Sequence, residues 1–223
     1  IKPMIKTLNF SIVFFFFLLL GTELSAQKFD EQINSLAIKY EKEMIELRHW
    51  FHQNAELSNR EFKTADRIAE ELKNIGLKPQ TGIAKTGVVA ILEGAKPGPV
   101  VALRADIDGL PIKERVNLPW KSEMIGEYNG ETVPVMHACG HDTHVAILLA
   151  TAKIMYDLKD QISGKIKFIF QPAEEGAPPG EEGGAELMVK EGVLLNPDVD
   201  AIFGLHIWSQ FEAGQIYVRP EGI

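Results

Sequence analysis

Short apolar runs alternate along this chain with longer segments in which apolar residues recur at helical spacing. The strand-like runs cover residues 88–92, 100–103, 165–170, 200–205 and 215–218. The segments with helical periodicity cover about residues 29–51, 59–75, 143–156 and 185–190. This alternation predicts an α/β domain with a mostly parallel sheet and helices on both faces. We therefore expect ligands to bind at the carboxyl ends of the strands, as they do in open α/β sheets.

The beginning of the sequence has the features of a secretory signal peptide. Lys6 precedes an apolar run over residues 10–20, and Ala26 is a small residue suited to a cleavage point. The run is shorter than the roughly 20 apolar residues that a membrane-spanning helix needs, although an uncleaved anchor is the alternative. We expect residues 1–26 to be a signal peptide and the exported remainder, residues 27–223, to lie in the periplasm or medium with no stable membrane span.

Composition and charge narrow the classes of partner. The 223 residues include 23 Lys and Arg against 31 Asp and Glu, a net charge of −8, so the chain has no basic surplus with which to bind nucleic acid. The hydrophobic fraction of 45% is that of a folded globular protein rather than a disordered one. Cys139 is the single cysteine and can form no internal disulfide. Small molecules and metal ions are therefore the expected partners.

The strongest candidate for a metal site is the segment 137–144. It contains His137, Cys139, His141, Asp142 and His144. A thiolate and an imidazole separated by one small residue can reach one ion or two neighbouring ions of the zinc type. A packed cysteine and a helix cap at Asp142 are the structural alternatives. We expect His137, Asp142 and His144 to support ligands rather than to be ligands, because a ligating imidazole needs its other nitrogen held.

Three further polar clusters follow apolar strands. Asp106 and Asp108 are two residues apart, so their carboxylates project to the same side of an extended segment. Glu174 and Glu175 are adjacent and point apart, so one can bind a metal while the other faces a water molecule. His206 ends an otherwise apolar strand. Taken singly, these features are typical of a turn, a solvated loop and a core histidine, but all share the strand-end position.

Together the clusters offer Cys139, His141, Glu175 and His206 as ligands, with charged neighbours around them. This set is too large and too acidic for a closed structural zinc, which takes four ligands that are typically rich in cysteine. It suits an open hydrolytic site with one or two metal ions, which polarises a carbonyl and activates water. Glu174 would then take the proton and deliver it to the leaving nitrogen.

Four motifs connect the chain with a known family. They are RADIDGLP at residues 104–111, MHACGHDTH at 136–144, QPAEEG at 171–176 and GLHIW at 204–208. They resemble the N-acyl-amino-acid amidohydrolase branch of the aminoacylase and carboxypeptidase metallopeptidase family, M20. That branch includes hippurate hydrolases, auxin-conjugate hydrolases and N-acetyldiaminopimelate deacetylases. The resemblance covers nearly the whole of residues 27–223.

The resemblance implies a catalytic domain that holds two divalent ions, zinc or manganese, and hydrolyses the amide between an acyl group and an amino acid. The ligand positions match Cys139, His141, Glu175 and His206. Glu174 matches the general base, and Asp108 matches the acid that orients a ligand. Asp106 stands where peptidase relatives carry a ligating histidine, and it is expected to lie beside the ligands. Near the first helix, Ala55 replaces the usual proline, with little expected consequence.

The family pattern also implies that this is the N-terminal fragment of a longer protein. A smaller lid and dimerisation domain, and a returning catalytic segment with one more ligand histidine, would follow. We expect a homodimeric full-length protein and little activity from residues 1–223 alone. The alternatives are a dipeptidase or carboxypeptidase with the same fold and a non-catalytic exported metal-binding protein. His49 and His52 are expected to be structural.

Overall fold

The computed structural model describes the backbone of residues 10–218 and the side chains of residues 27–218. The predicted signal peptide therefore lies partly outside the described residues, and its remainder is helical backbone at the start of helix α1 (Phe10–Gln53). Within the described part, no helix combines the length and apolar character needed to cross a membrane. The chain divides into two compact units, Ile1–Glu41 and Lys42–Ile223, and the following description concerns the second.

A five-stranded sheet forms the centre of this unit. Its order is β1 (Gln80–Ile83), β2 (Gly87–Glu93), β6 (Ser163–Gln171), β3 (Lys96–Asp106) and β7 (Ala201–Gly204). Strands β6, β3 and β7 are parallel, whereas β2 runs antiparallel to both β1 and β6. Four of the five strands therefore point in one direction. The predicted α/β class is confirmed, with the refinement that the sheet is mixed.

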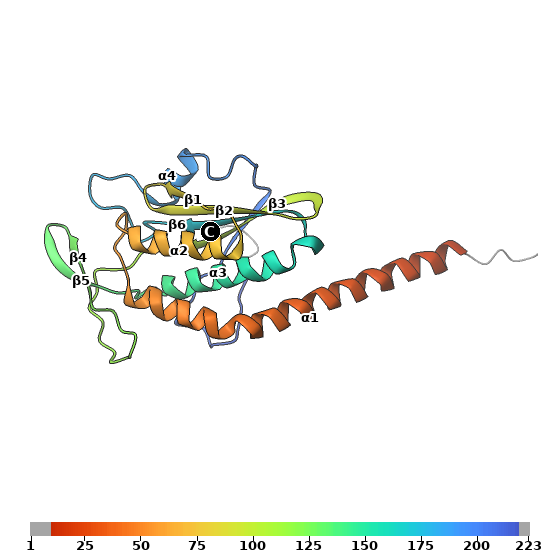
Figure 1. The fold of residues 1–223 in the computed structure, drawn as a ribbon, viewed down its shortest axis with the longest axis horizontal. Coiled ribbons are helices and arrows are strands. Elements are labelled where there is room, and N and C mark those ends of the chain that lie inside the picture. The colour runs from red at the N-terminus through yellow and green to blue at the C-terminus, as the bar shows by residue number, and fades with distance from the viewer. Residues whose placement is uncertain (1–9, 219–223) are drawn as a thin grey trace, which may run out of the picture. The chain divides into compact units, whose positions relative to one another are not determined.

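Helices cover both faces of the sheet. Helices α2 (Phe62–Ile75) and α3 (His141–Asp157) lie on one face and the short α4 (Gly184–Lys190) on the other (Figure 1). A 3-10 turn, η1 (Lys159–Gln161), follows α3. Alternate residues of β6 enter two separate cores: Phe168 and Phe170 pack in the core on the α2 and α3 side, and Ile169 packs in the core with Met188 of α4. This alternation follows from the two-residue period of a strand.

Three elements differ from the sequence prediction. Strand β1 was not predicted, although it forms one edge of the sheet. The hairpin β4 (Met124–Tyr128) and β5 (Glu131–Val135) was not predicted, although its turn at Asn129 and Gly130 carries a typical hairpin signal. The prediction of a strand over residues 215–218 was wrong. Ile216 and Val218 are each 83% exposed and join no strand within the described chain. The apolar run has the composition of a strand but has no partner strand among the described residues.

The register of the sheet brings three strand ends together. Asp106 at the end of β3 pairs with Gln171 at the end of β6, and Arg104 pairs with Gly204 at the end of β7. The polar residues that follow these strands therefore emerge side by side. Helix α3 begins at the same edge, because Gly140 at its N-cap has a left-handed φ of 90° and turns the chain into the helix.

Candidate metal centre

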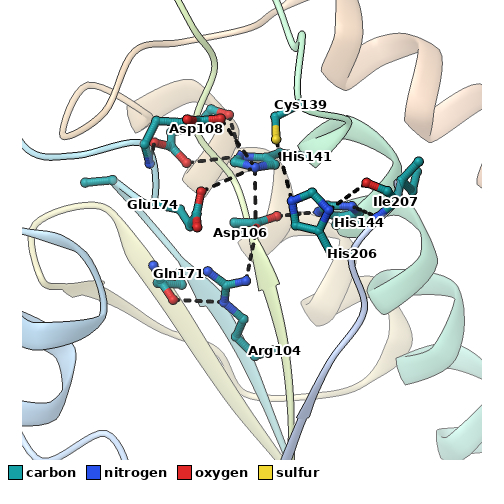
Figure 2. A network of polar contacts seen from close by, with 12 residues as sticks. Arg104, Asp106, Asp108, Cys139, His141, His144, Gln171, Glu174, His206 and Ile207 are labelled. Atoms are coloured by element: carbon teal, nitrogen blue, oxygen red, sulfur yellow. Dashed lines mark hydrogen bonds and ion pairs between the residues drawn. The ribbon is translucent and has the colours of Figure 1, made fainter. Parts of the chain in front are cut away.

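His141 lies at the centre of the predicted site (Figure 2). Its side chain is fully buried, and its Nδ1 lies 2.9 Å from the backbone oxygen of Asp108 and 3.2 Å from Oδ1 of the same residue. This contact makes Nδ1 the hydrogen-bond donor and leaves Nε2 as the free lone pair. Among the described residues Nε2 has no hydrogen-bond partner, although it is buried. A buried nitrogen of this kind fits a metal ligand.

The other predicted ligands surround this nitrogen. Cys139 Sγ lies 3.5 Å from His206 Nε2, and His141 Nε2 lies 3.8 Å from Glu175 Oε1 and 3.7 Å from Glu174 Oε2. Ligand atoms of Cys139, His141 and His206 lie within 4.8 Å of one another, and so do those of His141, Glu174 and Glu175. The structure thus brings all four predicted ligands and the predicted base to one place.

His144 holds the segment that carries His206. Its Nε2 accepts a hydrogen bond of 2.9 Å from the Ile207 N–H, and its Nδ1 donates one of 2.5 Å to Asp106 Oδ1. Both ring nitrogens are engaged, so neither is left for a metal ion. His206 itself directs Nδ1 to the Ile207 carbonyl at 2.6 Å and turns Nε2 towards Cys139.

Asp106 borders the cluster and is tied on both oxygens. Its Oδ2 accepts a hydrogen bond of 2.7 Å from Arg104 Nη1. Arg104 is held in turn, because its Nε donates to Gln171 Oε1 at 2.8 Å. Burial opposes ionisation of Asp106, but the hydrogen bond from His144 and the charge of Arg104 outweigh it and lower the pKa to about 2. Asp106 is therefore an anion held by its neighbours, and its Oδ2 lies 3.7 Å from His141 Nε2.

Asp108 connects two of the predicted ligands. Besides orienting His141, its Oδ2 accepts hydrogen bonds from Ser58 Oγ at 2.7 Å and from the Glu175 N–H at 3.0 Å. Burial alone would raise its pKa, but these hydrogen bonds lower it. This arrangement is the one that an orienting acid needs. No role was expected from sequence for Ser58 or Arg104, because each reaches the site through a contact with another residue.

The charge of the cluster fits a divalent cation. Burial, followed by the charge of Glu175, raises the pKa of the Cys139 thiol to about 11, so the thiol alone would remain protonated at neutral pH. A bound cation reverses this preference, because a coordinating thiol is deprotonated. Sulfur, imidazole and carboxylate ligands together are typical of zinc-type sites.

Two residues of the predicted cluster lie apart from the ligands. Asp142 accepts hydrogen bonds from His52 Nδ1 at 3.0 Å and Arg48 Nε at 3.1 Å, both on α1. His137 is buried, and within the described part its ring nitrogens have no hydrogen-bond partner. Neither residue hydrogen-bonds a predicted ligand in this part of the chain, so the expected supporting role of these two side chains is not seen. His49 stacks on Trp120, with ring centroids 3.8 Å apart.

Two pockets flank the Glu174–Glu175 pair. A pocket of about 390 Å³ reaches Glu175 and is walled by Leu57, Leu110 and Tyr128, the last of which belongs to the β4–β5 hairpin. A second pocket of about 500 Å³ lies on the side of Glu174. There is thus space on both sides of the cluster for the two halves of a small substrate.

The chain belongs to Peptidase family M20/M25/M40, whose pattern matches residues 102–221. This confirms the family resemblance inferred from the four motifs. The strand-end geometry and the cluster around His141 lie within the matched region, apart from contacts supplied by Ser58 and α1.

Particular relatives are close in sequence and in structure. The chain is 44% identical over 186 residues to an N-acyl-L-amino acid amidohydrolase of Geobacillus stearothermophilus, covering 83% of this chain and 46% of that protein. It is 42% identical over 190 residues to thermostable carboxypeptidase 2 of Saccharolobus solfataricus, covering 85% and 45%.

Among solved structures, the YXEP protein of Bacillus subtilis is described as a dinuclear metal binding peptidase from the M20 family. It matches with a TM-score of 0.66 and 38% identity, covering 75% of this chain and 43% of that one. The chain therefore spans about half the length of the relatives it matches.

Proposed function

We propose that the whole protein is a metal-dependent amidohydrolase that cleaves the amide bond of N-acyl amino acids. The observation that carries this proposal is the buried His141 Nε2, which lacks a hydrogen-bond partner among the described residues and faces Glu174 and Glu175. An amidohydrolase of this substrate class is also among the relatives at 44% identity.

Two divalent ions, zinc or manganese, would be held by Cys139, His141, Glu175 and His206. When bound, such ions act as Lewis acids towards a carbonyl group and make a water molecule more acidic. The protein positions these ligands through neighbours that are themselves fixed: Asp108 orients His141, and His144 holds the backbone next to His206. These contacts support the proposal, because metal ligands depend on such partners for their orientation.

Glu174 would serve as the general base. Its Oε2 lies 3.7 Å from His141 Nε2, and its side chain is 36% exposed, so it can reach both a water molecule and a substrate. Its carboxylate would take a proton from the attacking water and deliver it to the nitrogen of the leaving amino acid. The pocket beside Glu175, with its apolar wall at Leu57, Leu110 and Tyr128, would accept part of the substrate.

The direct test is a Glu174→Gln variant of the full-length protein. We expect hydrolysis of N-acetyl amino acids to fall by about 10²–10⁴-fold, the usual contribution of a general base, while bound metal per subunit is unchanged. Glu93→Gln is the matched control, because Glu93 pairs with Lys165 on the surface and lines neither of the two pockets. Undiminished hydrolysis by Glu174→Gln would remove the assigned role. A wild-type protein that binds metal without turnover would instead favour the binding-protein alternative.

A peptidase is the second candidate function, because a carboxypeptidase is 42% identical to this chain. The same site can cleave an amide whether its acyl part is an acetyl group or an amino acid residue. Comparing kcat/KM for N-acetyl amino acids and for dipeptides separates the two. We also propose export, on the pattern of residues 1–26, and a homodimeric full-length protein.

A further inference from the structure

The backbone immediately before Glu174 has an unusual conformation. Ala173 is buried and has a φ of 47°, in the left-handed region that residues with a side chain avoid. Strand β6 has already ended at Gln171, so in the described part of the chain no strand partner fixes this peptide. Such a conformation persists only where the surroundings determine it.

Glu61 supplies a fixed contact at this point. Its side chain is fully buried, Oε1 accepts a hydrogen bond of 2.8 Å from the Ala173 N–H, and Oε2 accepts one of 2.6 Å from Thr86 Oγ. Burial raises the pKa of Glu61 to about 7, although these hydrogen bonds oppose the rise. Burying a carboxyl group costs free energy, so a fully buried Glu61 calls for a reason. Its two hydrogen bonds indicate where to look for that reason.

The amide on the other side of Glu174 is held in the same way. Asp108 Oδ2 accepts the Glu175 N–H at 3.0 Å. Glu174 is therefore flanked by two residues, Ala173 and Glu175, whose N–H groups each donate to a buried carboxyl group. Asp108 was expected from sequence, whereas Glu61 lies 112 positions before Ala173 and carried no such expectation.

Capping of helix α2 does not account for the Glu61 side chain. Glu61 stands at the N-cap, but its side chain makes no capping hydrogen bond. The first-turn N–H of Thr64 is bound at 2.8 Å by Glu56 Oε2 instead. The Glu61 carboxyl group is directed away from the start of the helix and towards Ala173.

We propose that Glu61 is a positioning residue that fixes the Ala173 amide and thereby sets the placement of Glu174 and Glu175. This inference rests on the proposed function in assigning chemistry to those two residues. The positioning role can also be tested without a substrate, because the placement of Glu175 near His141 affects metal binding.

The experiment compares three variants of the full-length protein: Glu61→Leu, Glu61→Gln and Thr86→Val. Leu fills the space but accepts no hydrogen bond, so we expect kcat for N-acetyl amino acids to fall at least tenfold with KM within threefold. Gln keeps an acceptor oxygen for the Ala173 N–H and should restore kcat to within threefold of wild type. Thr86→Val removes the other partner of Glu61 and should lower the melting temperature while leaving kcat within twofold.

Binding of Co²⁺, followed by its visible absorption, gives a readout independent of turnover. We expect Glu61→Leu to weaken Co²⁺ binding at least fivefold and the other two variants to bind as wild type does. If the wild-type protein hydrolyses no amide, the proposed function fails and this titration still tests the positioning role.

Three results would overturn the inference. One is a folded Glu61→Leu variant with wild-type kcat and Co²⁺ binding. Another is a Thr86→Val variant that loses kcat as strongly as Glu61→Leu, which would indicate a general structural role. The third applies if Glu61→Leu does not fold, in which case Glu61→Gln decides. A kcat or Co²⁺ affinity of Glu61→Gln below one tenth of wild type would contradict a role that needs only a hydrogen-bond acceptor for the Ala173 N–H.

Discussion

Replacing His144 with leucine tests how the centre holds His206, its most exposed proposed ligand. His206 follows the edge strand β7 and is exposed, so its position depends on few contacts. One of these contacts lies at the neighbouring residue, where the Ile207 N–H donates to His144 Nε2 at 2.9 Å. The variant removes this hydrogen bond and also the one from His144 to Asp106, while leaving every proposed ligand in place.

The expected magnitude follows from the two lost hydrogen bonds. The bond with Ile207 contributes about 0.5–1.5 kcal/mol net and the bond with the ionised Asp106 about 1.5–3 kcal/mol, so together they are worth about 2–4.5 kcal/mol. Since 1.4 kcal/mol corresponds to a factor of ten in an equilibrium constant, metal affinity should fall by about 30-fold or more. This range overlaps the 10–100-fold loss that is usual when a partner of a metal ligand is removed.

The assay is a competition titration of the metal-free full-length protein with Zn²⁺ against a chromophoric chelator. Thr151→Val is the matched control, because it removes a side-chain hydrogen bond of 2.8 Å to Ile147 on the same helix, outside the cluster. We expect the control to bind Zn²⁺ as wild type does. A folded His144→Leu variant with an affinity within twofold of wild type would show that His206 does not depend on this anchor.

Two further predictions concern stability. The hydrogen bond with Asp142 raises the pKa of His52 above 6.5, although burial opposes the rise. Protonated His52 therefore stabilises the fold. This contribution is complete below pH 6.5 and is lost as the pH rises through the raised pKa. The measurement is the free energy of unfolding of metal-free protein, from urea titrations at several pH values. Above pH 6.5 it should fall with pH in wild type and fall less in His52→Gln. Equal slopes of this free energy against pH in the two proteins would contradict the prediction. Gly164 and Gly130 both have positive φ, but a Cβ at Gly164 would lie 2.0 Å from the Pro99 oxygen, whereas one at Gly130 would meet nothing within 4 Å. In the same titrations Gly164→Ala should cost at least about 2 kcal/mol more than Gly130→Ala, and equal costs would show that the backbone there yields.

The elements that were predictable from sequence are those whose burial imposes a pattern. Strands β2, β3 and β6 are covered on both faces and therefore appear as continuous apolar runs. The hairpin β4–β5 is partly exposed and lacks such a run, so only its Asn129–Gly130 turn marked it in the sequence. Residues 215–218 show the opposite error, because an apolar run does not make a strand without a partner.

The candidate site divides along similar lines. Cys139, His141, Glu174, Glu175 and His206 were predictable as neighbours, because each follows a strand or begins a helix at one edge of the sheet. The residues that hold them were not. Their roles depend on contacts between parts of the chain that are far apart in sequence, and a polar residue in a loop before a helix is more typically a cap. The residues missed in this way are Ser58, Glu61 and Arg104.

The acidic residues of the centre differ in how much of each carboxylate is already engaged. Asp106 and Asp108 are buried, and both oxygens of each are bound by side chains or backbone amides. Glu174 and Glu175 keep 36% and 23% of their side chains exposed at the same edge.

A carboxylate whose oxygens are all engaged can fix its neighbours but has little freedom to exchange a proton or move with a substrate. Removing such a group leaves several partners unsatisfied at once, whereas removing a partly exposed one leaves the scaffold intact. Substitution of Asp108 should therefore disturb folding and metal binding together. Glu174, the proposed base, has the least constrained of these side chains, so its substitution should leave folding and metal binding intact.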